Sequence, residues 1–347
     1  MGGFFGGILL GFAARWGRFC TLNAIEAQVL GGDSSGLRMW GMAIATAIAG
    51  TFALDQSGLI DIEATFYLAS PTSLLANSVG GLMFGLGMAL VGTCGYGTLA
   101  RVGGGDLKSV VTFLVMGITA YATLRGATAY LRVAVFPTPP SSEQPASFAH
   151  LISNFSGSNV HLVAYLAAAA LAIICLMQTE FRNQTKKYAV GVFVGLVIVW
   201  GWYSTGYLAA DDFDPYPVES FTFAAPLGET LIYGMTMTGS SLKFGIGAVL
   251  GVIVGAAATS VAQGYFRWEA CDDAREMRRQ ILGGFLMGFG SVTAFGCTIG
   301  QGVTAASLLA YSAPVTLISI YIGTWAGLHY LVSGSLLQPF RQLMRRG

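Results

Sequence analysis

The sequence predicts an all-α integral membrane protein with about nine transmembrane helices and about four short re-entrant helices, arranged as two inverted repeats. Three observations lead to this prediction. The chain has 347 residues, of which 54% are hydrophobic and 10% are charged, whereas a soluble domain carries roughly 25% charged residues. Its apolar residues fall into long stretches separated by short polar segments. Two glycine-rich segments also repeat along the chain with a constant spacing.

Nine apolar stretches are candidate spans, because roughly 20 apolar residues cross a bilayer core of about 30 Å and tilted or broken helices relax this length. They cover residues 3–16, 37–54, 72–92, 107–131, 160–179, 188–204, 241–262, 280–296 and 311–333. Four further apolar pieces are too short to span and too apolar for exposed loops, so we expect them to be re-entrant. They cover residues 19–30, 95–102, 229–238 and 298–308.

The positions of the basic residues predict the orientation of the chain. A formal net charge of +1 gives no nucleic-acid footprint. Three basic clusters are expected to face the cytoplasm: Arg182, Lys186 and Lys187; Arg267, Arg275, Arg278 and Arg279; and Arg341, Arg345 and Arg346. Counting spans from these clusters puts the amino terminus in the periplasm and the carboxyl terminus in the cytoplasm of a multi-pass inner-membrane protein.

An internal repeat is indicated by two segments that align with an offset of 203 residues, the spacing of Cys94 and Cys297. The matched positions are Gly80, Gly81, Gly85, Gly87, Cys94 and Gly97 in one segment and Gly283, Gly284, Gly288, Gly290, Cys297 and Gly300 in the other. A weaker match at an offset of 184 sets Gly7, Gly11 and Gly17 on Gly191, Gly195 and Gly201, and it sets Cys20 on Ser204.

The first and sixth spans would then cross in opposite directions, which is typical of transporters that hold their site between inverted repeats. We expect a single membrane domain over residues 1–347. It would comprise repeat one (1–132), an extracellular loop with a linking helix (133–187) and repeat two (188–347).

Two cysteines lie between glycines, in Gly92-Thr-Cys-Gly-Tyr-Gly and Gly296-Cys-Thr-Ile-Gly-Gln-Gly. Such glycines can break a helix and let the backbone approach a ligand closely. The short helix after each break offers unpaired N–H groups and the positive end of its dipole, which suits an anion without a cationic side chain. We therefore expect a substrate site at Cys94 and Cys297 with the neighbouring glycines Gly95, Gly97, Gly296 and Gly300.

Other residues near the breaks are weaker candidates. Cys20, in Gly17-Arg-Phe-Cys-Thr, opens another short apolar piece and is expected to contribute. Gln301 follows Cys297 by one turn and can donate from its amide to an oxyanion, although helix packing explains it equally well. Cys175 and Cys271 have no glycine break and are interpreted as bystanders. The five cysteines form no CxxC pair, and the sequence indicates neither a metal site, nor a cofactor, nor catalytic residues.

Ionisable residues flank the broken helices. Glu26, Arg18, Arg101 and Lys108 lie close to them along the chain, and ionisable groups at membrane depth are functional by default. Basic side chains near span ends can instead extend to the membrane surface and fix the topology. Both roles stay open for Arg15, Arg18 and Arg38.

Together, the three cysteine motifs resemble the signatures of the YeeE/YedE family of thiosulfate and sulfur-compound transporters. The resemblance covers nearly the whole chain, although the extracellular loop around 133–159 is long. It implies an hourglass-shaped inner-membrane protein that takes thiosulfate from the periplasm for sulfur assimilation into cysteine. It also implies that Cys20, Cys94 and Cys297 form a relay of thiols, with a TusA-like sulfur carrier as a cytoplasmic partner.

The hypothesis is that neutral thiols pass the ion by transient S–H contacts to its terminal sulfur, without a covalent intermediate. Three alternatives stay open. One is a transporter of another sulfur or selenium species, or of another small anion, with structural cysteines. Another is a membrane thiol or sulfurtransferase enzyme. The last is a structural scaffold, which leaves the two broken helices unexplained.

Overall fold

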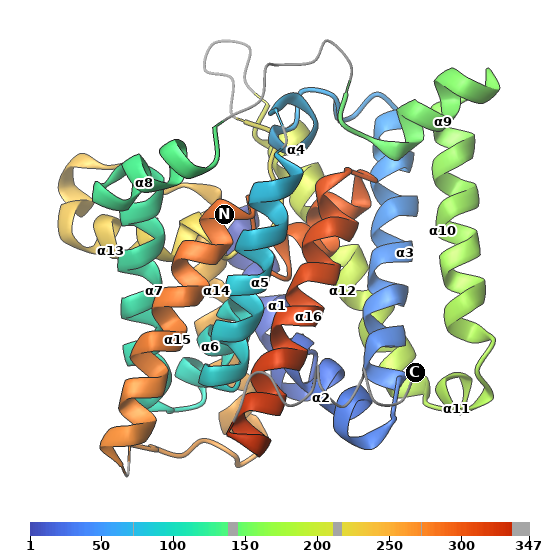
Figure 1. Cartoon of the computed structure of the whole chain (residues 1–347). Coiled ribbons are helices and arrows are strands. Elements are labelled where there is room, and N and C mark those ends of the chain that lie inside the picture. The colour runs from blue at the N-terminus through green and yellow to red at the C-terminus, as the bar shows by residue number, and fades with distance from the viewer. Residues whose placement is uncertain (72, 138–144, 211–216, 272, 335–347) are drawn as a thin grey trace.

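The computed structural model describes residues 1–71, 73–137, 145–210, 217–271 and 273–334. All named secondary-structure elements in this part of the chain are helices (Figure 1). Two isolated bridges are the only β-type pairings among these residues. Six of the described helices are long and apolar enough to cross a membrane, or up to seven if α9 (Phe148–Ser156) and α10 (Val160–Leu176) count as one bent span. The predicted class of an all-α membrane protein agrees with this architecture.

Each of the nine stretches predicted as spans contains a helix. These helices are α1 (Gly2–Trp16), α3 (Ser35–Gln56), α5 (Leu74–Val91), α7 (Leu107–Arg125), α10, α12 (Thr185–Tyr203), α14 (Phe244–Ala262), α15 (Ala274–Thr293) and α16 (Ser312–Ser333). Two of them, α1 and α10, have only 15 and 17 residues, and α15 carries four charged residues in its first two turns. The number of nine spans therefore stays a prediction.

The stretch predicted over 107–131 is interrupted. Helix α7 ends at Arg125, and Gly126 adopts an extended conformation before α8 (Ala127–Val135). The chain turns here because glycine lacks the Cβ atom that would press on the backbone of Ala122. The prediction of one continuous helix was wrong at this point, since hydropathy alone does not register a single backbone break.

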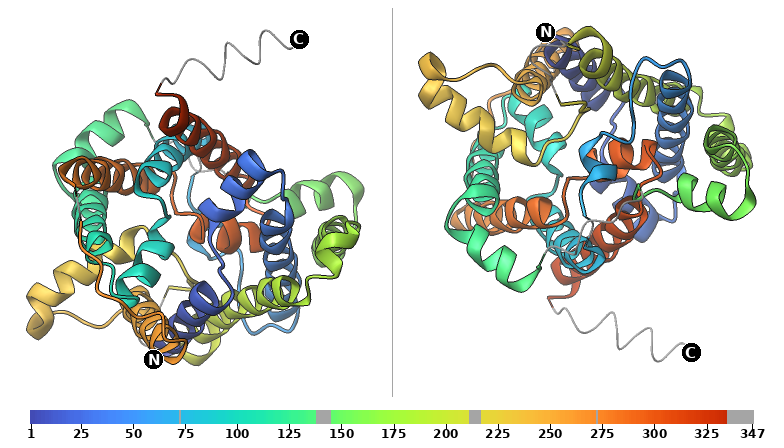
Figure 2. Two further views of the ribbon diagram at one scale, coloured as in Figure 1. Left: turned by 90° about the horizontal axis from the view of Figure 1, so that it is seen from below. Right: turned by 90° about the horizontal axis from the view of Figure 1, so that it is seen from above.

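Short helices occupy all four pieces predicted between the long ones. They are α2 (Thr21–Gly31), α6 (Gly95–Gly103), α13 (Ala225–Thr236) and the π-helical η3 (Gly300–Ala305). Seen along the long helices, α6 and η3 lie inside a ring formed by those helices (Figure 2). The remaining short elements are α4 (Phe66–Ala69), α11 (Thr179–Arg182), η1 (Ser204–Leu208) and η2 (Met237–Gly239).

The weaker repeat alignment fails at its last position. No break precedes Ser204, because α12 continues without interruption into the π-helical η1, where the Ser204 hydroxyl donates to the carbonyl of Gly201 at 3.0 Å. The chain instead enters the core through residues 217–224, which lead into α13. Segment 217–224, and not Ser204, therefore precedes the short helix of the second half. The acidic residues Asp211, Asp212 and Asp214 and the carboxyl-terminal basic cluster lie outside the described residues.

Close backbone contacts between glycine-bearing helices hold the ring together. A Cβ atom at Gly255 in α14 would overlap the backbone of Ile8 in α1, whereas nothing lies within 4 Å of a Cβ at Gly234 in α13. Small residues at such interfaces let membrane helices pack by van der Waals contact.

We expect Gly255→Leu to cost at least about 1–3 kcal/mol through overpacking, and Gly234→Leu to be tolerated. Detergent-solubilised protein would be compared by thermal unfolding and by the yield of monodisperse material. Equal unfolding temperatures for the two variants would contradict this close packing of α1 against α14.

Candidate functional site

The three predicted cysteines share one backbone feature. Each follows, by two residues, a residue in the left-handed region: Arg18 (φ 51°) before Cys20, Gly92 (φ 81°) before Cys94 and Phe295 (φ 58°) before Cys297. Left-handed conformations are unfavourable for residues other than glycine and gather at functional sites. The chain therefore makes the same kind of break at three places. At two of them the left-handed residue is Arg18 or Phe295, whose side chain makes this conformation unfavourable.

Each break places a cysteine at the start of a short helical segment. Cys20 is the N-cap of α2, and Cys94 is the N-cap of α6. The Cys297 carbonyl accepts the N–H of Gln301 at 2.8 Å, which begins the turn that leads into η3. The prediction that these cysteines sit at helix breaks agrees with the structure.

Backbone N–H groups point at two of the sulfur atoms. Gly97 donates to the Cys94 sulfur at 3.4 Å. The Cys297 sulfur accepts from Gly300 at 3.5 Å and from Phe223, in the segment before α13, at 3.3 Å. Because both sulfurs act as acceptors, each thiol proton remains available for donation to a ligand.

Cys94 lies at the centre of the site. The side chains of Cys20, Thr21 and Thr298 lie close to its sulfur, and Cys297 is close enough to interact with it electrostatically. Cys94 and Cys297 have no exposed surface, whereas Cys20 is partly exposed. Segments almost 280 residues apart in the chain, counting from Cys20 to Thr298, thus meet at one sulfur atom.

The predicted site glycines lie where side chains would collide or crowd. A Cβ atom at Gly97 would overlap the Thr93 hydroxyl, and one at Gly300 would overlap the Thr222 hydroxyl. A Cβ at Gly95 would meet only the flexible end of Met116, at 2.8 Å. At Gly296, the nearest atom would be Cγ of Gln301 at 3.0 Å.

Gln301 is buried, but its donors are occupied. Its Nε2 atom donates to the carbonyl of Ala294 at 3.0 Å and to that of Phe295 at 3.2 Å. Since an amide nitrogen carries two hydrogens, neither is left for an oxyanion in this conformation. Gln301 instead holds the loop that precedes Cys297, which is the packing role that the sequence left open.

A cavity of about 500 Å³ leads towards Cys297 from the end of the molecule that carries α4 and α8 (Figure 1). Phe295 and Gly296 form part of its wall. The described lining contains one cation, Arg132, and one carboxylate, Glu219, among mainly apolar and hydroxyl side chains. We call this cavity the vestibule.

Two of the charged residues near the breaks interact with other groups of the protein. Arg101 donates to the carbonyl of Gly92 at 2.6 Å and so braces the loop before Cys94. Lys108 forms an ion pair with Glu276 at 2.9 Å. Arg18 is exposed, and Glu26 is half-buried on α2. These contacts explain Arg101 and Lys108 without a direct role towards a ligand.

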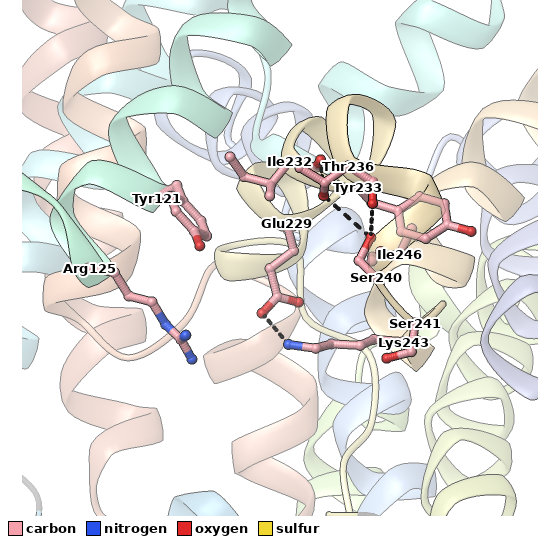
Figure 3. A pocket seen from close by; sticks show the side chains of 11 residues that line it. Tyr121, Arg125, Glu229, Ile232, Tyr233, Thr236, Ser240, Ser241, Lys243 and Ile246 are labelled. Atoms are coloured by element: carbon pink, nitrogen blue, oxygen red, sulfur yellow. Dashed lines mark hydrogen bonds and ion pairs between the residues drawn. The ribbon is translucent and has the colours of Figure 1, made fainter.

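A second polar cavity, of about 290 Å³, lies between α7, α13 and α14 (Figure 3). Its Glu229 and Lys243 form an ion pair at 3.2 Å, and Tyr121 and Arg125 reach towards it from α7. Its lining includes none of the cysteines. It is therefore separate from the site around Cys94.

The two remaining cysteines lie elsewhere. Cys175 is on α10, outside the ring, where its carbonyl accepts from Arg38 at 3.0 Å and its sulfur contacts Gly41. Cys271 is partly exposed in the loop between α14 and α15. Cys20, Cys94, Cys175 and Cys297 are free thiols.

Comparison with known proteins adds an independent finding. The model of a family described as "Sulphur transport" matches residues 16–326. The chain is 29% identical over 328 residues to the thiosulfate transporter TsuA of Spirochaeta thermophila, covering 92% of this chain and 95% of that protein. It is 26% identical over 355 residues to the thiosulfate transporter TsuA of Escherichia coli K12, covering 92% and 91% of the two chains.

Proposed function

Because this chain belongs to the sulphur transport family, we propose that it takes up thiosulfate across the cell inner membrane along a path lined by cysteine thiols and helix N-termini. The names of the two relatives are those of transporters and not of enzymes. The observation that supports the proposal best is the meeting of Cys20 and Cys94 with the Cys297 loop at the centre of the helix ring. Delivery of the sulfur to a TusA-like cytoplasmic carrier is part of the same proposal.

The positions of the thiols suggest an order along the path. The vestibule reaches Gly296, which directly precedes Cys297. Thr298 then adjoins Cys94, and Cys94 adjoins Cys20, whose side chain is partly exposed. An ion would therefore pass from the vestibule to Cys297, then to Cys94 and last to Cys20.

Helix ends and thiols can offset the cost of burying the ion. Thiosulfate carries two negative charges, and a buried ion without partners is very unfavourable. The N–H groups of Gly97 and Gly300 lie at the starts of α6 and η3, where the helix dipole favours an anion. The thiols add weak S–H donors, and weak binding at successive sites lets the ion move on.

Passage requires movement in the site. Cys94, Cys297 and Gln301 have no exposed surface, so this conformation holds the path closed at its centre. Glycines on either side of each buried cysteine give the two loops the freedom to shift. In this proposal the loops open transiently as the ion enters from the vestibule.

The proposal includes two inverted repeats, supported by reciprocal helix contacts. In the repeat alignment, α1 corresponds to α12 and α5 corresponds to α15. Helix α1 packs against α14, and its counterpart α12 packs against α3. Likewise α5 packs against α16, and its counterpart α15 packs against α7. The aligned glycines follow the same rule: Gly7 and Gly11 face carbonyls of α14, while Gly191 and Gly195 face carbonyls of α3. In Figure 1, α1 runs from the amino terminus towards α2, and α12 runs the opposite way from α11.

The proposed topology has nine spans with a periplasmic amino terminus and a cytoplasmic carboxyl terminus. Helix α11, which contains Arg182, and the loop between α14 and α15, which contains Arg267, lie at the same end of the molecule (Figure 1). Under the positive-inside rule this end faces the cytoplasm. The vestibule, at the other end, then opens to the periplasm.

The proposed function is tested by growth and uptake. A bacterium that lacks sulfate uptake and depends on thiosulfate as its sulfur source is expected to grow when it expresses this chain and to accumulate ³⁵S from labelled thiosulfate. An empty vector provides the control. Expressed, membrane-inserted protein without uptake of thiosulfate would contradict the proposal, and uptake of selenite or another anion alone would favour the alternative transporter.

A further inference from the structure

The dipeptide Cys-Thr occurs at two of the three helix breaks, as Cys20-Thr21 and as Cys297-Thr298. The breaks belong to opposite halves of the chain. The fold brings both threonines to the same place, because the side chains of Thr21 and Thr298 each lie beside the sulfur of Cys94. Cys94 thus has one hydroxyl from each half next to it.

Both hydroxyls are buried without a closer polar partner among the described residues. Thr21 is 5% exposed and Thr298 is 0% exposed, and neither Oγ1 atom makes a regular hydrogen bond. Buried hydroxyl groups are nearly always hydrogen-bonded, since an unpaired one loses its water without compensation. Two such groups beside one sulfur atom need an explanation.

Neighbouring threonines show that the surrounding backbone offers acceptors. Thr98 donates to the carbonyl of Cys94 at 3.0 Å, and Thr304 donates to the carbonyl of Phe221 at 2.6 Å. Some threonines within helices also bond to the backbone: Thr259 and Thr324 donate to the carbonyl four residues earlier. Thr21 and Thr298 differ because their hydroxyls face the Cys94 sulfur and not a carbonyl.

We propose that Thr21 and Thr298 form the oxygen-binding part of the transport site, their hydroxyls donating to the sulfonate oxygens of thiosulfate while the thiols contact its terminal sulfur. This inference rests on the proposed function and names the groups that orient the ion. Thiosulfate has two chemically different ends, a terminal sulfur and three oxygens. A site with thiols and free hydroxyls side by side offers a donor suited to each end, and hydrogen bonds to an anion are stronger than those to neutral acceptors.

The arrangement also gives a basis for selectivity against sulfate. Sulfate presents only oxygen atoms, so it can engage the two hydroxyls but leaves the large, weakly polar thiols opposite an oxygen. Thiosulfate matches both kinds of donor at once. Discrimination of this kind needs no cationic side chain, in keeping with the absence of Lys and Arg from the two glycine-cysteine loops.

The test is initial-rate uptake of ³⁵S-thiosulfate by the full-length protein in membrane vesicles, with valine and serine at each position. Valine keeps the shape of threonine without the hydroxyl, and serine keeps the hydroxyl without the methyl group. We expect Thr298→Val and Thr21→Val to lower uptake roughly ten- to hundredfold, as expected for an anion left without a buried donor. Thr298→Ser and Thr21→Ser are expected to stay close to the wild-type rate.

A matched control is Thr51→Val, because Thr51 on α3 is also fully buried and its hydroxyl also lacks a partner among the described residues. Its uptake is expected to remain at the wild-type level. A packing role for Thr21 and Thr298 would give the opposite pattern, in which valine is tolerated and serine is harmful. That pattern, or equal losses with valine and serine, would overturn the inference while leaving thiosulfate uptake by the wild-type chain intact. A wild-type chain without uptake would overturn the proposed function and, with it, this inference.

Discussion

Replacing Cys94 by alanine is expected to abolish thiosulfate uptake. Cys94 is the residue to which Cys20, Thr21 and Thr298 all turn, and its sulfur is held in place by the N–H of Gly97. Alanine removes the sulfur atom beside which these groups lie, so the ion would meet an apolar methyl group at this point of the proposed path. The measurement is uptake of ³⁵S-thiosulfate in cells, normalised to the amount of protein in the membrane.

Cys175→Ala is the matched control, because Cys175 is also buried but lies on the peripheral helix α10. It is expected to keep the wild-type rate. We also expect Cys94→Ser to be strongly impaired, since the shorter and harder hydroxyl is a poor match for the terminal sulfur. Full uptake in Cys94→Ser would favour a general anion carrier in which the cysteines are structural.

The alternative hypothesis, that the chain is a membrane thiol enzyme, can be tested on the wild-type protein. In the relay that we propose, the thiols make only noncovalent contacts with the ion. Mass spectrometry of protein stopped during turnover is then expected to show unmodified Cys20, Cys94 and Cys297. A persulfide or a mixed disulfide on Cys94 that appears and disappears with thiosulfate would instead favour a sulfurtransferase-like mechanism.

Gly97→Ala is expected to lower uptake to less than about a tenth of the wild-type rate. A Cβ atom at this position would overlap the Thr93 hydroxyl, and both residues are buried. Overpacking of this kind displaces the backbone, and here it would move the N–H that points at Cys94. Uptake assays and thermal unfolding would separate a misplaced donor from a protein that no longer folds.

Two further variants make this prediction specific. Gly95→Ala serves as the control, because its Cβ meets the flexible end of Met116 and is expected to have a small effect. The double variant Gly97→Ala/Thr93→Ala removes the hydroxyl that causes the overlap and is expected to recover a substantial part of the activity. If the double variant were as inactive as Gly97→Ala, the collision with Thr93 would not be the cause.

Much of the architecture could be predicted from local patterns. Long apolar stretches predicted nine helices, and helices occupy all of them; the short pieces after Cys20, Cys94 and Cys297 are helical as expected. These features depend on hydropathy and on glycine placement, which act over a few residues at a time. The match of Gly85 with Gly288 also corresponds to equivalent packing, against Ile320 in α16 and against Met116 in α7.

Other predictions failed or were incomplete where distant segments decide the outcome. Ser204 was aligned with Cys20, but the chain of the second half enters the core only at 217–224. There, the backbone N–H of Phe223 donates to the sulfur of Cys297, a contact that no local sequence pattern predicts. Gln301, a candidate donor to the substrate, uses its amide to hold its own loop.

The sequence by itself determined that this is a membrane protein of apolar helices, because a bilayer requires every backbone polar group to be hydrogen-bonded within the protein. It also indicated three helix breaks, each followed by a cysteine, because glycine marks places where a helix can stop. The repeated Cys-Thr dipeptide was also visible, yet nothing in it distinguishes a ligand-facing hydroxyl from one bonded to a carbonyl. Only the tertiary structure decided that Thr21 and Thr298 meet at Cys94, since that contact depends on how helices from the two halves of the chain pack against each other.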